Sequence, residues 1–130
     1  MIKAIIIDAS AVARGLLNTV LLDGGYDVVG QTHTMAQGLA LAVKHHPQLI
    51  CIAREQIEDG SGMAEELRAR LPKALIFMVS GAIDAATIQS SLALGINGFI
   101  VKPFKADAVL KSIKAAVLAL VRKHQAPAAE

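Results

Sequence analysis

The feature that most constrains this chain is a regular alternation between two apolar patterns. Short apolar runs are separated by longer segments in which apolar residues recur every three or four positions. The first pattern is typical of strands buried on both faces, and the second is typical of helices that cover a sheet. We therefore expect an α/β fold with a parallel sheet between two layers of helices. The expected strands are Ile2–Ile7, Tyr26–Gly30, Leu49–Ala53, Ala74–Ser80 and Gly98–Val101.

Capping and turn residues indicate five helices between and after these strands. Ser10 is a typical N-cap residue, and the pair Gly24-Gly25 is a typical helix end. Right-handed connections then give an open doubly wound sheet, for which the flavodoxin-like order 2-1-3-4-5 is the common small arrangement. The expected helices begin after the Ser10 cap, at about Thr34, at about Gly62, near Asp84 and at Ala106, and the second, third and last end at His45, Leu71 and about His124.

Apolar spacing predicts the inward faces of four helices. We expect these side chains to pack against the sheet. They are Val12, Leu16, Val20 and their neighbours in the first helix, Met35, Leu39, Ala42 and Val43 in the second, Met63 and Leu67 in the third, and Val109, Leu110, Ile113, Val117, Leu120 and Val121 in the last. The fourth helix shows Ile88, Leu92 and the turn residue Gly95.

A length of 130 residues fits one domain with a single core. We assign residues 1–124 to that domain and residues 125–130, which lack periodicity, to a flexible C-terminal tail. The apolar runs are far shorter than the roughly 20 residues that a membrane span needs, so no membrane insertion is expected.

Composition narrows the class of protein further. The single cysteine, Cys51, has no intramolecular partner, so a disulfide framework is excluded and a cytoplasmic location is expected. The net charge of +2 comes from scattered Lys and Arg residues, and one Tyr, three Phe and no Trp leave little aromatic surface for stacking bases. Direct contact with nucleic acid is therefore not expected.

The residues just after the strands are the candidate site, because ligands of doubly wound sheets bind beyond the carboxyl ends of the strands. The first strand is followed by an acidic and hydroxyl-bearing segment, the third by a charged loop, the fourth by a hydroxyl and a glycine, and the fifth by a basic residue. These residues are Asp8, Ala9 and Ser10; Ala53, Arg54 and Glu55; Ser80 and Gly81; and Lys102, Pro103 and Phe104.

This constellation resembles the receiver domain of bacterial two-component response regulators, the CheY-like family, over nearly the whole chain. The resemblance is carried by Ile5-Ile6-Ile7-Asp8, by the segment from Gly24 to Gly30, by the run into Ser80, and above all by the segment from Gly95 to Phe104. It implies an acidic pair that holds Mg²⁺, an Asp that accepts a phosphoryl group from a histidine kinase, a Ser or Thr that hydrogen bonds this group, and a Lys that pairs with it.

Three of these positions match the family and two depart from it. Asp8, Ser80 and Lys102 match, whereas Ala9 replaces the second acid and Ala53 replaces the phosphate-accepting Asp. A methyl group offers neither a nucleophile nor an oxygen ligand. We therefore expect no cofactor, lost or weak Mg²⁺ binding, and no catalytic residue, since the strand ends hold no pair of nucleophile and base.

Neighbouring acids are possible substitutes in the loop after the third strand. Of Glu55, Glu58 and Asp59, only Glu55 lies close enough in sequence to Ala53 to serve as a metal ligand with Asp8 or as a phosphate acceptor. We expect it instead to be a solvated loop acid.

The residual pocket is expected to be structural. Asp8 and Lys102 should neutralise each other, since an unpaired half-buried charge is costly, and Ser80 should bond locally. The Lys102-Pro103 bond resembles the family's cis peptide. Phe99 holds the place of the family's switch aromatic, and because it lacks a hydroxyl we expect it to stay buried.

The resemblance implies a signalling role through protein contacts, independent of phosphorylation. The expected partner is a signalling protein, either a histidine kinase or an output protein, and the expected oligomeric state is a monomer or a weak homodimer. Two alternatives stay open: a small-molecule sensor whose ligand fills the pocket near Ala53 and Lys102, and a phosphoacceptor that uses Glu55. The expected binding face joins the fourth helix, the fifth strand and the last helix through Leu92, Leu94, Ile96, Lys111, Lys114 and Ala115.

Overall fold

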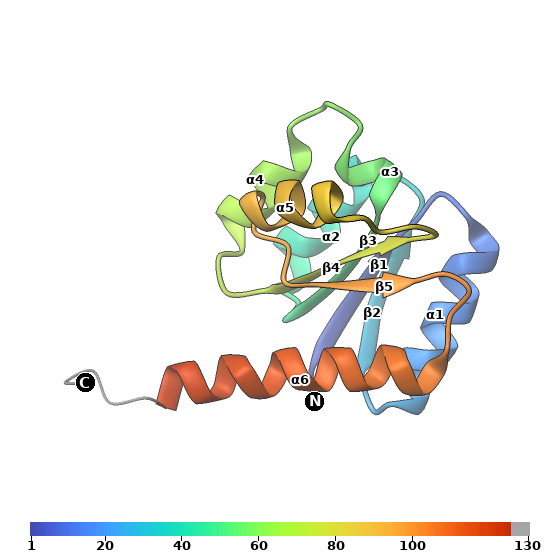
Figure 1. Cartoon of the computed structure of the whole chain (residues 1–130), viewed down its shortest axis with the longest axis vertical. Helices are drawn as coiled ribbons and strands as arrows, with labels where there is room; N and C mark the ends of the chain where they lie inside the picture. The colour runs from blue at the N-terminus through green and yellow to red at the C-terminus, as the bar shows by residue number, and fades with distance from the viewer. Residues whose placement is uncertain (126–130) are drawn as a thin grey trace.

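The computed structural model, which describes residues 1–125, contains a five-stranded parallel sheet with the order β2-β1-β3-β4-β5 (Figure 1). This order and the doubly wound α/β architecture confirm the sequence prediction. The strands are β1 (Lys3–Ile7), β2 (Asp27–Thr32), β3 (Leu49–Ala53), β4 (Leu75–Ser80) and β5 (Gly98–Val101).

Side chains of the central strands alternate between two apolar cores, as the pleat of a strand requires. In β1, Ile5 and Ile7 enter one core, whereas Ala4 and Ile6 enter the other. All residues of β3 and β4 are buried, which explains why these strands appear in the sequence as continuous apolar runs.

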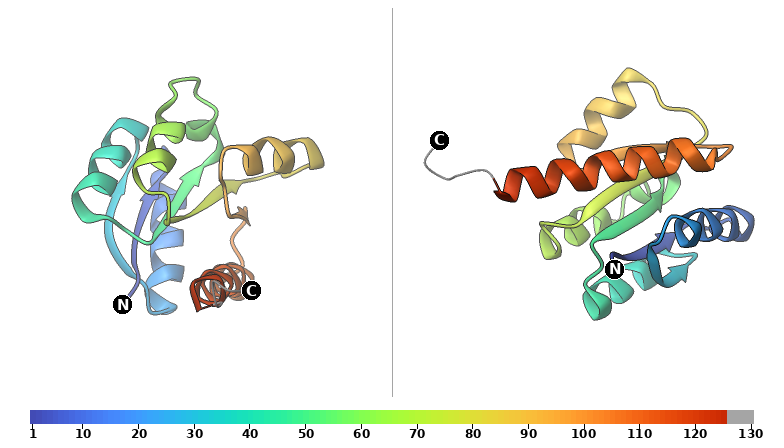
Figure 2. Two further views of the ribbon diagram at one scale, coloured as in Figure 1. Left: turned by 90° about the vertical axis from the view of Figure 1, so that its left-hand side faces the viewer. Right: turned by 90° about the horizontal axis from the view of Figure 1, so that it is seen from below.

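Six helices within the described residues cover the two faces of the sheet (Figure 2). The helices α1 (Ala11–Asp23) and α6 (Ala106–Gln125) lie on one face, and their apolar residues join the core that contains Ile6. The other face is covered by α2 (Met35–His45), α3 (Arg54–Ile57), α4 (Met63–Arg70) and α5 (Ala85–Ala93).

The prediction of five helices is wrong by one, because the segment expected to be a loop after β3 contains the short helix α3. Its last residue, Ile57, is buried against the core that contains Ile5 and Ile7. This burial explains how a four-residue helix persists, since a helix of this length is not stable by its own hydrogen bonds.

The buried stripe of α1 is displaced by one position along the sequence from the predicted one. Val12 is 74% exposed and Leu16 is 56% exposed, whereas Leu17 and Leu21 are buried and Val20 is half-buried. The two stripes are adjacent, and both are apolar at intervals of four, so periodicity alone cannot choose between them. The predicted ends of the helix are confirmed, with Ser10 as N-cap and Gly24 as C-cap.

The polarity of α5 is the reverse of that of an ordinary helix covering a sheet. Ile88 and Leu92 are exposed, whereas the small polar residues Thr87 and Ser91 face the sheet. Ser91 donates a hydrogen bond from Oγ to the sulfur of Met78, which gives this buried hydroxyl a partner. A helix with apolar side chains on its outer face leaves them available for another contact.

The remaining helix faces agree with the prediction except at two valines. Val43 in α2 and Val121 in α6 are exposed, whereas Ala42 and Ile113 are fully buried.

None of the helices formed by the described residues is long and apolar enough to span a bilayer. The predicted flexible tail begins at Gln125, which is the last residue of α6, and its remaining residues 126–130 lie outside the described part of the chain.

Candidate functional site

The site lies at the carboxyl ends of β1, β3, β4 and β5, where the parallel topology brings together residues that are far apart in the sequence. At its centre, Nζ of Lys102 lies 3.2 Å from Oδ2 of Asp8. The Asp8 side chain is 8% exposed and the Lys102 side chain is 32% exposed, so this is a largely buried ion pair. The expected pairing of Asp8 with Lys102 is therefore present.

The other oxygens of Asp8 also have partners. Its Oδ1 accepts a hydrogen bond of 2.9 Å from the backbone N–H of Ser10, and its carbonyl oxygen accepts one from Nη1 of Arg14. Ser10 in turn caps α1 by accepting a bond from the backbone N–H of Ala13. Asp8 is thus fixed by the start of α1 as well as by Lys102.

Ala53 is the last residue of β3 and is only 1% exposed. It serves as the N-cap residue of α3 without a side-chain hydrogen bond. Ala9, the other departure from the family pattern, is exposed beside Asp8. Both methyl groups therefore stand at the site edge of the sheet and contribute no oxygen to it.

Ser80 ends β4, and its hydroxyl is used within its own turn. Its Oγ donates to the carbonyl oxygen of Ala82 at 2.8 Å and accepts from the backbone N–H of Ala82 at 3.2 Å. This local bonding confirms the prediction for Ser80. The bond between Lys102 and Pro103 is cis, like the family's peptide that it resembles. The backbone N–H of Lys102 donates to the carbonyl oxygen of Ser80.

Arg54 is a site residue to which the sequence analysis gave no role. Its Nε lies 3.1 Å from both carboxylate oxygens of Glu58, and its Nη1 donates to the carbonyl oxygen of Ala82 at 3.1 Å. The spacing of Arg54 and Glu58 is the interval of four at which helical side chains meet, but the segment was not expected to be helical. The contact with Ala82 joins α3 to the loop after β4 and has no signal in the sequence.

The acids proposed as substitutes do not gather at Ala53. Glu55 is exposed in the first turn of α3, and Glu58 pairs with Arg54. Hydrogen bonds from the hydroxyl and backbone N–H of Ser61 lower the pKa of Asp59, which faces its own turn. Among residues 1–125, no group of three or more His, Cys, Asp and Glu side chains is placed to hold a metal ion.

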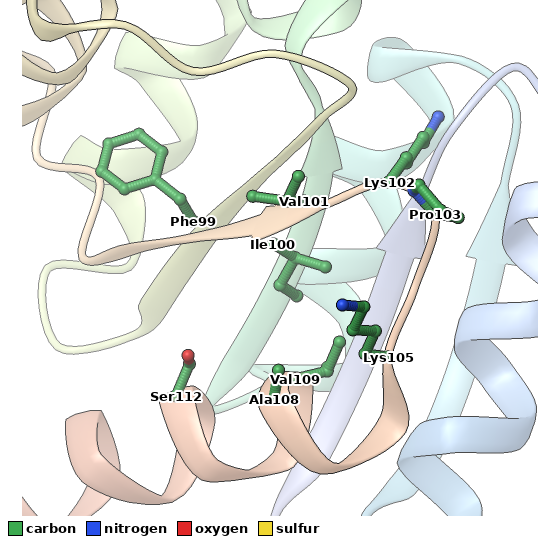
Figure 3. Close-up of a pocket in the computed structure, with 9 residues that line it drawn as sticks. All are labelled: Phe99, Ile100, Val101, Lys102, Pro103, Lys105, Ala108, Val109 and Ser112. Carbon is green, nitrogen blue, oxygen red and sulfur yellow. The ribbon is translucent and has the colours of Figure 1, made fainter.

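Phe99 is half-buried, so the expectation that it stays buried is met in part. It packs against the core on the α5 side of the sheet, and Figure 3 shows its ring directed away from Ser112 and α6. Val101 is 53% exposed, and Ile100 between them is buried on the other face. Phe99 and Val101 thus lie at the edge of the sheet, since β5 is its last strand.

A groove of about 380 Å³ runs between β5 and α6 next to these side chains. Besides residues of β5, it is lined by Lys102, Lys105, Ala108 and Ser112 (Figure 3). A second hollow of about 240 Å³ lies on the other side of Pro103, against Val12, Leu16 and Phe104. Ala53 lines neither of them.

The predicted binding face is partly present on the surface. Leu92 is 57% exposed, Leu94 is half-buried, and Ile96 is buried at 4% exposure, so Ile96 was wrongly placed there. Ile96 instead joins the core below α5 because the turn after that helix brings it inward. The α6 residues of this face, Lys111, Lys114 and Ala115, are exposed.

The chain belongs to the family of response regulator receiver domains, because the model of that family matches residues 4–114. It is 30% identical over 112 residues to the chemotaxis protein CheY of Bacillus subtilis, a match that covers 85% of this chain and 93% of that protein. It is also 30% identical over 122 residues to the probable transcriptional regulator ycf27 of Porphyridium aerugineum, covering 93% of this chain but 48% of that protein.

Solved structures show the same fold. The CheY-like receiver domain protein of Methanospirillum hungatei JF-1 superposes with a TM-score of 0.82 at 21% identity, covering 95% of this chain and 98% of that one. The receiver domain of a modulated diguanylate cyclase from Desulfovibrio desulfuricans G20 superposes with a TM-score of 0.81 at 22% identity, covering 95% and 98%. The flavodoxin-like architecture predicted from the sequence is therefore that of a two-component receiver domain.

Proposed function

We propose that this chain is a receiver domain that acts in signal transduction without being phosphorylated, through contacts with another protein. The observation that carries the proposal is the side chain at the end of β3. Ala53, which stands at the acceptor position, is a buried methyl group that can neither attack a phosphoryl group nor bind a metal ion. The family relationship supports the signalling role, and Ala53 supports its independence from phosphorylation.

The charges of the pocket support the same proposal. Lys102 would pair with a phosphoryl group in an ordinary receiver, and Asp8 would contribute to the Mg²⁺ site. Here the two groups pair directly at 3.2 Å, so each has a charged partner without a bound cation or anion. A ligand that recruits either group would have to break this ion pair, which opposes binding of Mg²⁺ as well as phosphate.

The proposed contact surface joins the outer faces of α5, β5 and α6. Ile88, Leu92 and Val101 expose apolar surface there, and Lys111 and Lys114 add positive charge from α6. A mixture of apolar side chains with a charged rim is typical of protein interfaces. We propose that it binds a signalling protein, either a histidine kinase or an output protein, and that self-association through the same face is weak. Neither nucleic acid nor a membrane is a proposed ligand.

A phosphodonor experiment with a matched gain-of-function control tests the proposal. The purified protein is incubated with acetyl phosphate and Mg²⁺, and covalent phosphate is measured by intact mass spectrometry. The wild type is expected to gain no phosphoryl group, whereas the double variant Ala9→Asp, Ala53→Asp, which restores both carboxylates, is expected to gain one. Circular dichroism checks that the buried Asp of the variant is tolerated.

Labelling of the wild type would overturn the proposal. If that label then disappeared in Glu55→Gln, the chain would be a phosphoacceptor that uses Glu55. If neither the wild type nor the folded double variant were labelled, the pocket would have lost more than two carboxylates, and the role assigned to Ala53 would be wrong.

A further inference from the structure

The side chain next to Ala53 makes a contact that crosses the site. Arg54 is the first residue of α3, and its guanidinium reaches the loop between β4 and α5, which residues 81–84 form. The two carboxylate oxygens of Glu58 hold its Nε, one turn further along α3. The guanidinium plane is therefore fixed from its own helix before it meets the loop.

The acceptor of this contact, the carbonyl oxygen of Ala82, also accepts a hydrogen bond within its own turn. The carbonyl oxygen of Ala82 accepts from Nη1 of Arg54 at 3.1 Å and from Oγ of Ser80 at 2.8 Å. The backbone N–H of the same residue donates back to Ser80 Oγ at 3.2 Å. Ala82 is thus tied to the end of β4 by one partner and to the start of α3 by the other.

The positive charge of Arg54 also acts on the next polar group of the loop. Asp84 caps α5 by accepting a hydrogen bond of 2.8 Å from the backbone N–H of Thr87. The pKa of this carboxyl is lowered first by its hydrogen bonds to Thr87 and to a smaller extent by Arg54. Arg54 therefore favours both the position of Ala82 and the charged form of the cap.

We propose that Arg54 is a built-in clamp that holds the β4–α5 loop, and with it the start of α5, in one arrangement. Arg54 directly follows Ala53, which offers no acceptor for a phosphoryl group, and it is joined to this loop by a hydrogen bond. Because α5 carries the exposed side chains of Ile88 and Leu92, the clamp fixes the surface that these residues present. This role of Arg54 goes beyond the proposed function, and it does not depend on whether the chain can be phosphorylated.

Amide NMR of Arg54→Ala tests the clamp, with Arg70→Ala as the matched control. Arg70 also forms an i, i+4 ion pair on an exposed helix surface, at 3.6 Å from Glu66, but it is not bonded to the β4–α5 loop. In the wild type and in Arg70→Ala, the backbone order parameters of residues 82–84 are expected to stay near the value of a rigid backbone, about 0.85. In Arg54→Ala they are expected to fall toward about 0.6.

Hydrogen exchange gives a second readout on a slower timescale. The amide of Thr87, which donates to Asp84, is expected to exchange about tenfold faster in Arg54→Ala, as loss of a charge-assisted hydrogen bond predicts. The amide of Ile76, which donates to Asn97 away from the site, serves as the internal reference for global stability. Arg54→Lys, which lacks the second donor arm, is expected to resemble Arg54→Ala.

The clamp is rejected if Arg54→Ala and Arg70→Ala give the same order parameters in the loop and the same Thr87 exchange relative to Ile76. A change that spreads evenly over all amides would also reject it, because it would show a general loss of stability instead of a released loop. The order parameters and the Thr87 exchange test the clamp independently of the phosphodonor experiment. An unexpected labelling result would not change how they are interpreted.

Discussion

The carboxylate of Asp8 and the ammonium group of Lys102 lie 3.2 Å apart, at the ends of two strands that are not neighbours in the sheet. Asp8 is the more buried partner, and Ser10 gives its second oxygen a hydrogen bond. Charges taken out of water are costly unless they are paired. The ion pair therefore explains how two charged residues that match the family's phosphorylation site are accommodated beside an acceptor position that is an alanine.

Removing Lys102 alone is expected to destabilise the fold, because it leaves the carboxylate of Asp8 buried without its counter-charge. For Lys102→Met we expect a loss of about 1–2 kcal/mol in the free energy of unfolding, below the cost of a fully buried pair since Lys102 is partly exposed. Adding Asp8→Asn should recover most of this loss. Urea unfolding of the two single variants and the double variant measures the coupling, and additive losses would contradict the structural role of the pair.

The orientation of α1 makes a sharp prediction about two adjacent leucines. Leu17 is 1% exposed and Leu16 is 56% exposed. Leu17→Ala should cost about 2–5 kcal/mol of stability through a buried cavity, whereas Leu16→Ala should cost less than about 1 kcal/mol. Thermal and urea unfolding of both variants measures the difference. Equal losses, or a larger loss at Leu16, would show that the helix is rotated from the orientation described above.

Two glycines should respond in opposite directions to the same substitution. A Cβ atom at Gly98 would lie 2.5 Å and 2.8 Å from atoms of the buried Phe77 ring, whereas at Gly15, in α1, it would meet nothing within 4 Å. Gly98→Ala is expected to destabilise the protein by about 1–3 kcal/mol through overpacking. Gly15→Ala is expected to stabilise it by up to about 1 kcal/mol through helix propensity. Differential scanning calorimetry of both variants provides the comparison.

The N-cap of α5 predicts a dependence of stability on pH. Hydrogen bonds from Thr87 place the pKa of Asp84 in the folded protein below its ordinary value. A lowered pKa means that the contribution of this carboxyl to stability is complete above its unfolded pKa and is lost as the pH falls through the lower folded value. Carboxyl carbon chemical shifts should therefore give a midpoint for Asp84 below that of the unfolded chain.

The matched control for this titration is Asp84→Asn, which can still cap the helix but cannot ionise. The stability of this variant should fall less than that of the wild type between neutral pH and the acid range. An Asp84 midpoint at or above the unfolded value would mean that the carboxylate is not held by Thr87.

The strand pattern was predictable because β3 and β4 are buried on both faces and leave an unbroken apolar signal. The matching site positions followed from parallel topology, which fixes where Asp8, Ser80 and Lys102 must meet. The buried face of α5 was not predictable, since periodicity cannot show that Thr87 and Ser91 are the buried residues. The contact from Arg54 to Ala82 was also not predictable, because it depends on how closely α3 approaches the β4–α5 loop in space.

The measurement that tests the central claim most directly is a two-dimensional amide NMR spectrum with and without Mg²⁺ and beryllofluoride, a mimic of a phosphoryl group. The informative amides belong to Arg54, Ser80, Gly81, Phe99 and Lys102. The double variant Ala9→Asp, Ala53→Asp serves as the positive control and is expected to shift. For the wild type we predict no saturable shift, because Ala53 offers no ligand and Lys102 is paired with Asp8. Saturable shifts of these amides in the wild type would show that the pocket still binds phosphate-like ligands and would contradict the account.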